Sequence, residues 1–355
     1  MKTISLFFIC CLFVTACSGS AATVTVQPGP TPNPTATATV QPGPTPEASD
    51  FLARLPPTEV AYLDEALDII QKNALNKDKV DWPSLRTMLL EQGNDIKTRT
   101  ETYGLIRAAL FELHDYHSFF MTPEETSALI NAPPPESTMP QYDMVDDRYA
   151  EVIMYGFGSL NADQDRKYAD EMQQNIRELN LKNPCGWIVD LRMNTGGNMW
   201  PMLAGLGPIL GNGIFGSFIN PDGTKEAWSY QNGKAMVGSD VAVQISGQPY
   251  RISHPDAPVA VLLGNETASS GEIIALSFIG RSNTRSFGSK TSGLTTANTT
   301  FPMSDGAMIF LTTAVDADRT GKVYGQEISP DIETLGDGIP KEALQWLADQ
   351  PDCKK

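Results

Sequence analysis

The sequence predicts an α/β protein with a helical subdomain in front of its main domain. From residue 141 onward, short apolar runs of strand length alternate with segments whose apolar side chains recur at helical spacing. Residues 51–131 show helical spacing throughout, and a proline cluster at 133–140 separates the two patterns. We therefore expect a helical cap subdomain over 51–140 and an α/β core over 141–355.

The first residues carry the features of an export signal. Met1-Lys2 precede an apolar run over 4–14 that is too short to span a bilayer comfortably. The run ends in Val14-Thr-Ala-Cys17, which resembles a bacterial lipobox. We expect a signal peptide over 1–16 and a membrane-anchored lipoprotein of the bacterial cell envelope, with the lipid on Cys17. An ordinary secretory signal is the alternative, and either one exports the protein.

The segment after the signal has the composition of a linker. Residues 18–49 are mostly Ser, Thr, Ala, Pro and Gly, and the same seven residues occur at 26–32 and at 40–46. This density of proline excludes helix and sheet, and the segment has too little apolar surface to fold. We expect 17–50 to hold the lipidated cysteine and an extended tether.

Charge and cysteine content limit the partners and the redox state. The formal net charge of -16 argues against nucleic acid as a partner, because the chain carries no excess of positive charge to neutralise its phosphates. Of the five cysteines, Cys10 and Cys11 leave with the signal and Cys17 is lipidated. Cys185 and Cys353 remain, in a compartment that allows disulfides, and the sequence leaves open whether they pair.

A strand-to-helix turn over 264–272 is the first candidate catalytic segment. It follows the apolar run 257–263 and precedes a short helical segment over 273–280. A hydroxyl at such a turn meets the free N–H groups and the positive end of the helix, which favour developing negative charge. Ser269 or Ser270 is therefore a candidate nucleophile. The alternative is that both serines only cap the helix.

A second loop, over 192–199, also follows an expected buried strand and precedes a helix. Loops of this kind lie at the carboxyl ends of the strands, where ligands usually bind. Gly196 and Gly197 are therefore candidates to offer N–H groups to an oxyanion. A tight turn is the alternative, since two glycines supply one in any case.

A serine nucleophile needs a base, and the chain has three histidines. His254 lies in an expected surface turn. His114 and His117, with Glu112 and Asp115, could bind a divalent ion, but no second cluster completes a ligand set. We expect no metal or other cofactor. A general base is the better role for this cluster, with Asp115 or another carboxylate orienting the ring.

Six motifs follow one another along most of the folded part, from about residue 60 to 335. They are Asp115-x-His-Ser118, Asp190-Leu-Arg-x-Asn-Thr-Gly-Gly197, Thr267-Ala-Ser-Ser-Gly-Glu272, Gly288-Ser-Lys-Thr-Ser-Gly293, Ser304-Asp-Gly306 and Gly325-Gln-Glu-Ile-Ser-Pro-Asp331. This series resembles the carboxy-terminal-processing and tricorn-core family of serine peptidases, and within it the nisin-resistance-protein group. The resemblance implies a crotonase-like core, shared with the Clp protease, beneath a helical cap.

The resemblance also implies how the catalytic residues divide their roles. It makes Ser269 the nucleophile and His117 the base. The oxyanion hole is implied to come from the N–H of Ser270 and from Gly196 or Gly197.

Further roles follow from the same resemblance. Asn198 and Met199 are implied to line the substrate groove. Together with Asp115, which the residues themselves suggest, Glu327 and Glu272 are candidates for orienting the catalytic pair. Glu327 stands where the family often has glycine, and the alternative is that it is only a charged residue of a loop. For Glu272, bracing the loop is the better role than acting as an acid.

The chain departs from the family at two places. Leu294 occupies the position of the lysine base of the processing proteases, so their Ser–Lys dyad is absent; Lys290 is a weaker alternative base. The stretch between cap and core is too short for a separate PDZ domain.

The function expected from the sequence is that of an exported, lipid-anchored serine endopeptidase. Its expected substrate is a peptide or an unfolded protein, with small exported peptides such as lantibiotics as one class and envelope proteins as another. A non-catalytic peptide-binding module, or an esterase or amidase on the same core, is the alternative.

Overall fold

The structure is a computed structural model that describes residues 57–92, 97–334, 336 and 338–354. The predicted signal peptide, the lipid site at Cys17 and the linker lie outside these residues. None of the helices in the described ranges is both long and apolar enough to cross a bilayer.

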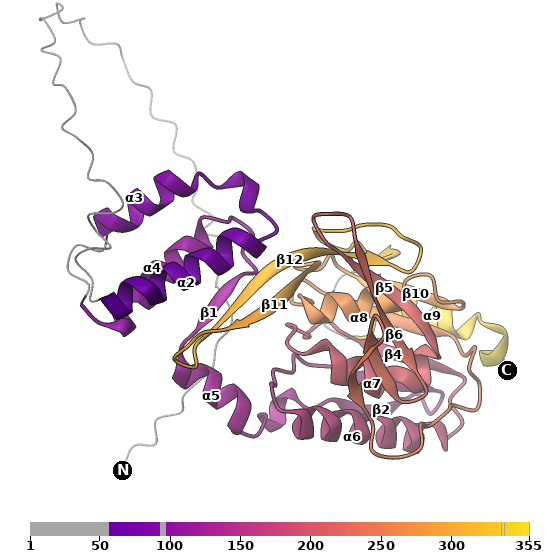
Figure 1. The fold of residues 1–355 in the computed structure, drawn as a ribbon. Helices are drawn as coiled ribbons and strands as arrows, with labels where there is room; N and C mark the ends of the chain where they lie inside the picture. Colours follow the sequence, from indigo (N-terminus) through magenta and orange to yellow (C-terminus); the bar gives the residue numbers. More distant parts are fainter. Residues whose placement is uncertain (1–56, 93–96, 335, 337, 355) are drawn as a thin grey trace, which may run out of the picture. The chain divides into compact units, whose positions relative to one another are not determined.

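The cap consists of helices whose apolar faces meet the tip of a strand pair from the core (Figure 1). Ile70 and Leu110 of the helices belong to one buried cluster with Ile309 and Leu311 of that strand pair. Burial of an amphipathic face, more than helix propensity, stabilises helices of this length. The cap elements are α2 (Pro57–Asn73), η1 (Lys77–Lys79), α3 (Trp82–Gln92) and α4 (Arg99–Phe111).

A six-stranded sheet forms the centre of the core, in the order β13-β10-β9-β4-β3-β2. All its neighbours pair in parallel except β2 and β3, which are antiparallel. Parallel strands need crossover segments, and in this chain helices supply most of them. The strands are β2 (Gln141–Val145), β3 (Tyr149–Ile153), β4 (Gly186–Asp190), β9 (Val259–Leu263), β10 (Thr284–Gly288) and β13 (Ile332–Glu333).

Helices cover both faces of this sheet, as the continuous apolar runs of its strands require. Val189 and Val261 point to the face packed by α6, α7 and α8, whereas Ile188 and Leu262 point to the face packed by α9. The alternation has the period of two that a strand imposes. The helices are α6 (Ala162–Asn180), α7 (Met199–Leu210), α8 (Ser270–Phe278) and α9 (Lys341–Ala348).

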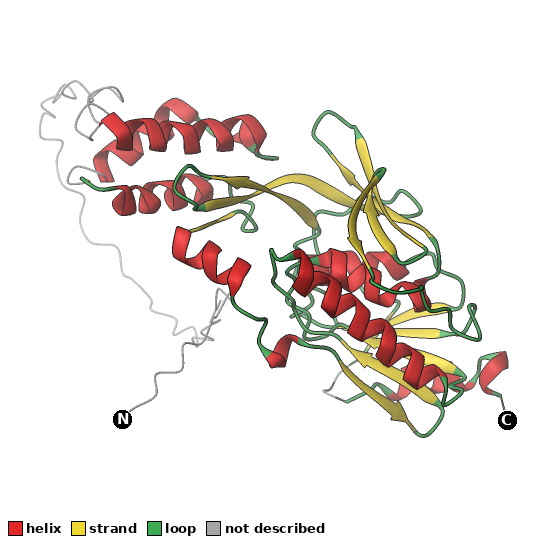
Figure 2. Ribbon diagram, turned by 60° about the horizontal axis from the view of Figure 1, so that its bottom comes forward, coloured by secondary structure: helices red, strands yellow, loops and turns green. Residues whose placement is uncertain are grey.

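A second sheet of seven strands connects the core with the cap. Its order is β1-β12-β5-β6-β7-β8, and β11 pairs with β12 off this path. One end of β12 pairs with β5 and the other with β1, so this strand extends from the core to the cap (Figure 2). The strands are β1 (Phe119–Met121), β5 (Gly213–Ile219), β6 (Lys225–Gln231), β7 (Lys234–Val237), β8 (Asp240–Gln244), β11 (Thr296–Pro302) and β12 (Met308–Asp318).

The sequence did not predict β1, because three residues are too few to show a periodicity. Strand β1 follows the cap helices in the chain, and its pairing with β12 makes it part of the same sheet as the β11–β12 hairpin. Between β1 and β2 the chain forms only α5 (Pro123–Asn131) and η2 (Glu136–Thr138), with no further domain among these described residues.

Cys185 and Cys353 form a disulfide, which decides the question that the sequence left open. Cys185 directly precedes β4, and Cys353 ends the 3₁₀ turn η3 (Pro351–Cys353) after α9. The bond joins residues 168 positions apart and fastens the C-terminal segment to the central sheet.

Candidate active site

Ser269 lies at the turn between β9 and α8 in a strained backbone conformation. Its φ of 51° and ψ of −119° are rarely adopted by a residue with a side chain, and such a conformation costs on the order of 1–3 kcal/mol. Its amide donates to Glu272 Oε2 at 2.9 Å, as part of a capping box at the start of α8. The turn also places the Ser269 hydroxyl within hydrogen-bond distance of a residue outside α8.

His117 meets this hydroxyl from the other side of the site. Its Nε2 lies 2.8 Å from Ser269 Oγ, although the two residues are 152 positions apart in the sequence. Its Nδ1 lies 2.7 Å from Thr296 Oγ1 at the start of β11. The His117 side chain is buried, so both ring nitrogens are held within the protein.

The loop that carries His117 is shaped by Asp115. One carboxylate oxygen accepts from the amides of His117 and Ser118, at 2.9 and 2.8 Å, and the other accepts from the Ser118 hydroxyl. His114 and Tyr116 adopt positive φ values of 51° and 54° in the same loop. Asp115 therefore orients the backbone that presents the imidazole, and its hydrogen bonds do not go to the ring.

Burial lowers the pKa of His117 from 6.5 to about 4, and the charge of Asp115 offsets only part of this effect. A buried imidazole loses the hydration that stabilises its charged form. The ring is therefore neutral at pH 7. A neutral imidazole is the form that can accept a proton from a serine.

The second glycine loop lies against the turn at Ser269. A Cβ on Gly196 would stand 2.9 Å from Ser269 Cβ. The Gly196 amide donates to Asn194 Oδ1, whereas the amides of Gly197 and Ser270 make no hydrogen bond to any described residue. The Ser270 hydroxyl donates to the Gly197 carbonyl at 2.6 Å and fixes the two loops together. Of the two glycines, Gly197 is therefore the one whose N–H has no hydrogen-bond partner among the described residues.

The backbone at both glycines requires the absence of a side chain. Their φ values are 101° at Gly196 and 111° at Gly197, in the region that L-residues rarely adopt. A Cβ on Gly197 would also come within 2.2 Å of the Phe157 carbonyl oxygen. The close approach of this loop to its neighbours therefore depends on glycine at these positions.

Glu272 accepts hydrogen bonds from the turn at Ser269 and from the segment before β11. Its fully buried carboxylate accepts from the Ser269 amide, from Thr291 Oγ1 at 2.5 Å, and from the amides of Gly293 and Leu294 at 3.0 and 2.7 Å. Burial raises the pKa of Glu272, and these hydrogen bonds oppose the rise. The side chain thus ties the turn to the segment before β11.

Glu327 and Lys290 form an ion pair with each other at the surface. The distance between Glu327 Oε1 and Lys290 Nζ is 3.1 Å, and both side chains are about half exposed. Neither is hydrogen-bonded to Ser269 or His117. This placement favours the loop-charge alternative for Glu327 and gives Lys290 no hydrogen bond to Ser269.

The two predicted groove residues are occupied by other contacts. Asn198 is the N-cap residue of α7, and its Oδ1 accepts from the Trp200 amide while its Nδ2 donates to Asp165 and to the Ser159 carbonyl. Met199 is buried in the main core. Their role in a substrate groove stays a prediction.

His114 and His254 are exposed and lie outside this constellation. The described ranges hold no group of three or more His, Cys, Asp or Glu side chains that could hold a metal ion.

Thr296 is the residue that sequence reasoning missed. It lies in a stretch rich in threonine, and no motif distinguishes it from its neighbours.

Two comparisons with known proteins decide the family. Residues 148–334 match peptidase family S41. The nisin-resistance protein of Lactococcus lactis subsp. lactis is 30% identical over 297 residues, which cover 83% of this chain and 89% of that protein. The chain belongs to peptidase family S41. The resemblance drawn from the six motifs is thereby confirmed. His117 lies before the matched segment, so its role rests on geometry.

Solved structures extend the likeness of this S41 peptidase to its three-dimensional fold. A lipoprotein from Streptococcus agalactiae aligns with a TM-score of 0.68 at 26% identity, over 88% of this chain and 99% of that one. The photosystem II D1 C-terminal processing protease shares the fold, with a TM-score of 0.51 at 16% identity over 82% and 96% of the two chains. The predicted α/β peptidase fold is confirmed.

Proposed function

We propose that this S41 peptidase is an endopeptidase in which Ser269 attacks the substrate and His117 takes the proton of its hydroxyl. The observation that carries the proposal is the 2.8 Å contact between Ser269 Oγ and His117 Nε2. The strained turn at Ser269 supports it, because strain of this kind clusters at functional sites. The lowered pKa of His117 also supports it, since it keeps the base unprotonated at neutral pH.

The chemistry follows from these positions. Ser269 Oγ attacks the carbonyl carbon of the scissile bond while its proton passes to His117 Nε2. The oxyanion that forms accepts hydrogen bonds from the N–H groups of Gly197 and Ser270. His117 then gives the proton to the departing amine, which leaves an acyl-enzyme. Water attacks this ester by the same route in reverse and releases Ser269.

We further propose that the substrates are small exported peptides, antimicrobial peptides among them. The name of the relative, nisin-resistance protein, supports this class. The burial of His117 supports it as well, because a flexible, extended chain can reach a recessed pair of side chains more easily than a folded surface can. Processing of envelope proteins is the competing class of substrate.

Location outside the cytoplasm is part of the proposal. The Cys185–Cys353 disulfide supports it, since such bonds persist mainly in oxidising compartments. The lipobox-like sequence before Cys17 supports a lipid anchor, and the similar Streptococcus agalactiae protein is itself a lipoprotein.

A fluorophosphonate probe tests the proposed pair directly, because it reacts covalently with an activated serine. We expect the purified protein to be labelled, and Ser269→Ala and His117→Ala to lose labelling. His254→Ala is the matched control, since it removes an exposed histidine that lies outside the site. An unlabelled wild type, or equal labelling of the Ser269→Ala variant, would refute the pair.

A panel of peptides then separates the remaining classes. Cleavage of short peptides at internal bonds is the expected result. Hydrolysis of esters or simple amides alone would make the protein an esterase or amidase, and cleavage confined to unfolded envelope proteins would support the processing role. Absence of both labelling and turnover would leave a peptide-binding module.

A further inference from the structure

We propose that Thr296 is the third member of the catalytic set and selects the tautomer of His117 in which Nε2 accepts the serine proton. The proposal rests on the function proposed above and assigns a positioning residue to the same site. The observation is the 2.7 Å contact between Thr296 Oγ1 and His117 Nδ1, on the side of the ring opposite Ser269.

A neutral imidazole carries one proton, and its position decides whether the pair can react. With the proton on Nδ1, His117 donates to Thr296 Oγ1, and the free Nε2 accepts from the Ser269 hydroxyl. With the proton on Nε2, the ring donates to Ser269 and cannot remove its proton. The Thr296 hydroxyl can donate as well as accept, so the contact by itself fits both tautomers; the proposal assigns Oγ1 the acceptor role, which corresponds to the reactive tautomer.

In many serine hydrolases a carboxylate occupies this position. None of the described carboxylates is hydrogen-bonded to the His117 ring. Asp115 bonds to the loop backbone, Glu272 to the nucleophile turn, and Glu327 to a surface lysine. The neutral hydroxyl of Thr296 thus takes the geometric role without adding a negative charge, which agrees with the lowered pKa of His117.

The strand pair β11–β12 holds the histidine loop at further points. Asn298 Nδ2 donates to the His117 carbonyl at 2.8 Å, and the Thr312 amide donates to the Ser118 hydroxyl at 2.9 Å. These bonds fix the backbone of the loop, and the contact with Thr296 fixes the ring. The position of Thr296 relative to His117 is therefore set by the same two strands.

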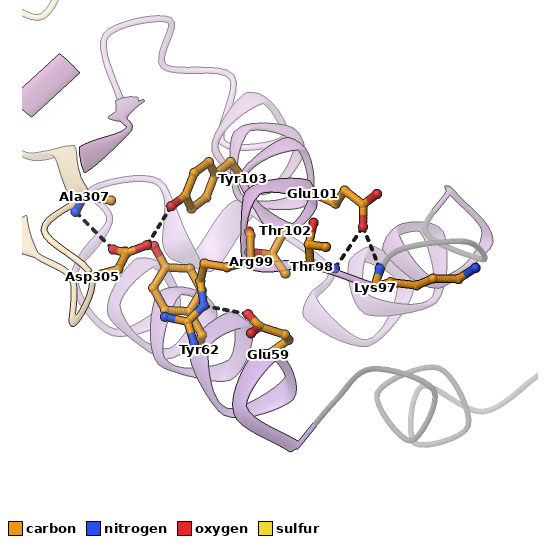
Figure 3. A network of polar contacts seen from close by, with 10 residues as sticks. All are labelled: Glu59, Tyr62, Lys97, Thr98, Arg99, Glu101, Thr102, Tyr103, Asp305 and Ala307. Carbon is orange, nitrogen blue, oxygen red and sulfur yellow. Dashed lines mark hydrogen bonds and ion pairs between the residues drawn. The ribbon is translucent and has the colours of Figure 1, made fainter. Parts of the chain in front are cut away.

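The far end of this strand pair is fastened to the cap. Asp305, in the turn between β11 and β12, accepts from the hydroxyls of Tyr62 and Tyr103 at 3.1 and 2.7 Å (Figure 3). Helix α4 leads directly into the loop that carries His117. The hairpin therefore contacts the cap at its turn, through Asp305, and the loop at the start of β11, through Thr296. Thr296 is the only residue of the hairpin that is hydrogen-bonded to the ring within the described chain.

Substitution of Thr296 tests the proposal in the full-length protein. We expect Thr296→Val to lower kcat about 10- to 100-fold with little change in KM, because the productive tautomer loses its partner. Thr296→Ser keeps the hydroxyl and should retain activity within about threefold of the wild type. Thr299→Val is the matched control: Thr299 lies on the same strand and its hydroxyl contacts Thr313, away from the site.

The pH profile separates this role from a merely structural one. Loss of the acceptor removes a hydrogen bond from the imidazolium, so the acid limb of kcat/KM in Thr296→Val should stay at or below its wild-type position. A ring released into solvent would instead move that limb upward toward pH 6.5. Nitrogen chemical shifts of the labelled His117 ring should show the Nδ1–H tautomer in the wild type and a shift toward Nε2–H in Thr296→Val.

Two results would overturn the proposal. The first is wild-type kcat in Thr296→Val, and the second is an Nε2–H tautomer in the wild-type protein. Failure of the proposed function would look different, since the wild type itself would then not be labelled by the fluorophosphonate probe. If the wild type and Thr296→Val were labelled equally while His117→Ala was not, the Ser269–His117 pair would stand and the role of Thr296 would be refuted.

Discussion

Acidification should destabilise the protein through His117, and the structure sets the size of the effect. The pKa of this residue falls from 6.5 to about 4 on folding, because burial disfavours the charged ring. Between these two values the unfolded chain binds the proton and the folded chain does not, so stability falls as the pH falls. The contribution is fully present above pH 6.5. The loss reaches about 2 kcal/mol at pH 5 and about 3 kcal/mol at pH 4.

Denaturant unfolding of the wild type and of His117→Asn measures this loss. The variant lacks the titrating ring, so the wild type should lose about 2 kcal/mol more than the variant between pH 7.5 and pH 5. Buried acids such as Asp165, whose pKa burial raises to about 6, titrate in both proteins and cancel in the difference. The comparison requires the same m-value in both proteins, which is the slope of the free energy of unfolding against denaturant concentration. Equal m-values show that both proteins expose a similar surface when they unfold.

Kinetics give a second measure of the same pKa. The acid limb of kcat/KM reports the essential base of the free enzyme, so activity should persist down to about pH 5 and halve near pH 4. A limb near pH 6.5, with equal pH dependence of stability in wild type and variant, would refute the reasoning. It would mean that the His117 ring is solvated in the working enzyme.

Two further predictions concern the backbone of the site and its attachment to the cap. Gly197→Ala should lower the rate of fluorophosphonate labelling about 100-fold, because its Cβ would meet the Phe157 carbonyl at 2.2 Å. Gly211→Ala is the control, since Gly211 shares a positive φ but has no atom near its added Cβ; equal effects in the two variants would contradict the steric reasoning. Asp305→Ala should destabilise the protein by about 2–4 kcal/mol in urea unfolding, because two tyrosine hydroxyls and an amide lose their acceptor. A change below about 0.5 kcal/mol would show that this cluster does not hold the hairpin to the cap.

The sequence by itself predicted most of the helices and strands and the loops that meet at the candidate site. The strand, turn and helix around Ser269 are encoded by neighbouring residues, since apolar periodicity and small turn residues are local signals. The two serines of that turn could not be told apart from the turn alone; the order of the six motifs selected Ser269. The histidine followed from the same resemblance and from the small number of histidines in the chain.

Only the tertiary structure decided which side chains face one another. Thr296 lies 179 residues from His117, and nothing in its immediate sequence marks it as the partner of the ring. Gly197 is the better candidate for the oxyanion hole because the Gly196 amide already donates to Asn194 Oδ1. The Cys185–Cys353 bond forms because α9 brings the C-terminal segment back to the central sheet. Such pairings arise when strands and helices from distant segments pack together. A local pattern therefore cannot specify them.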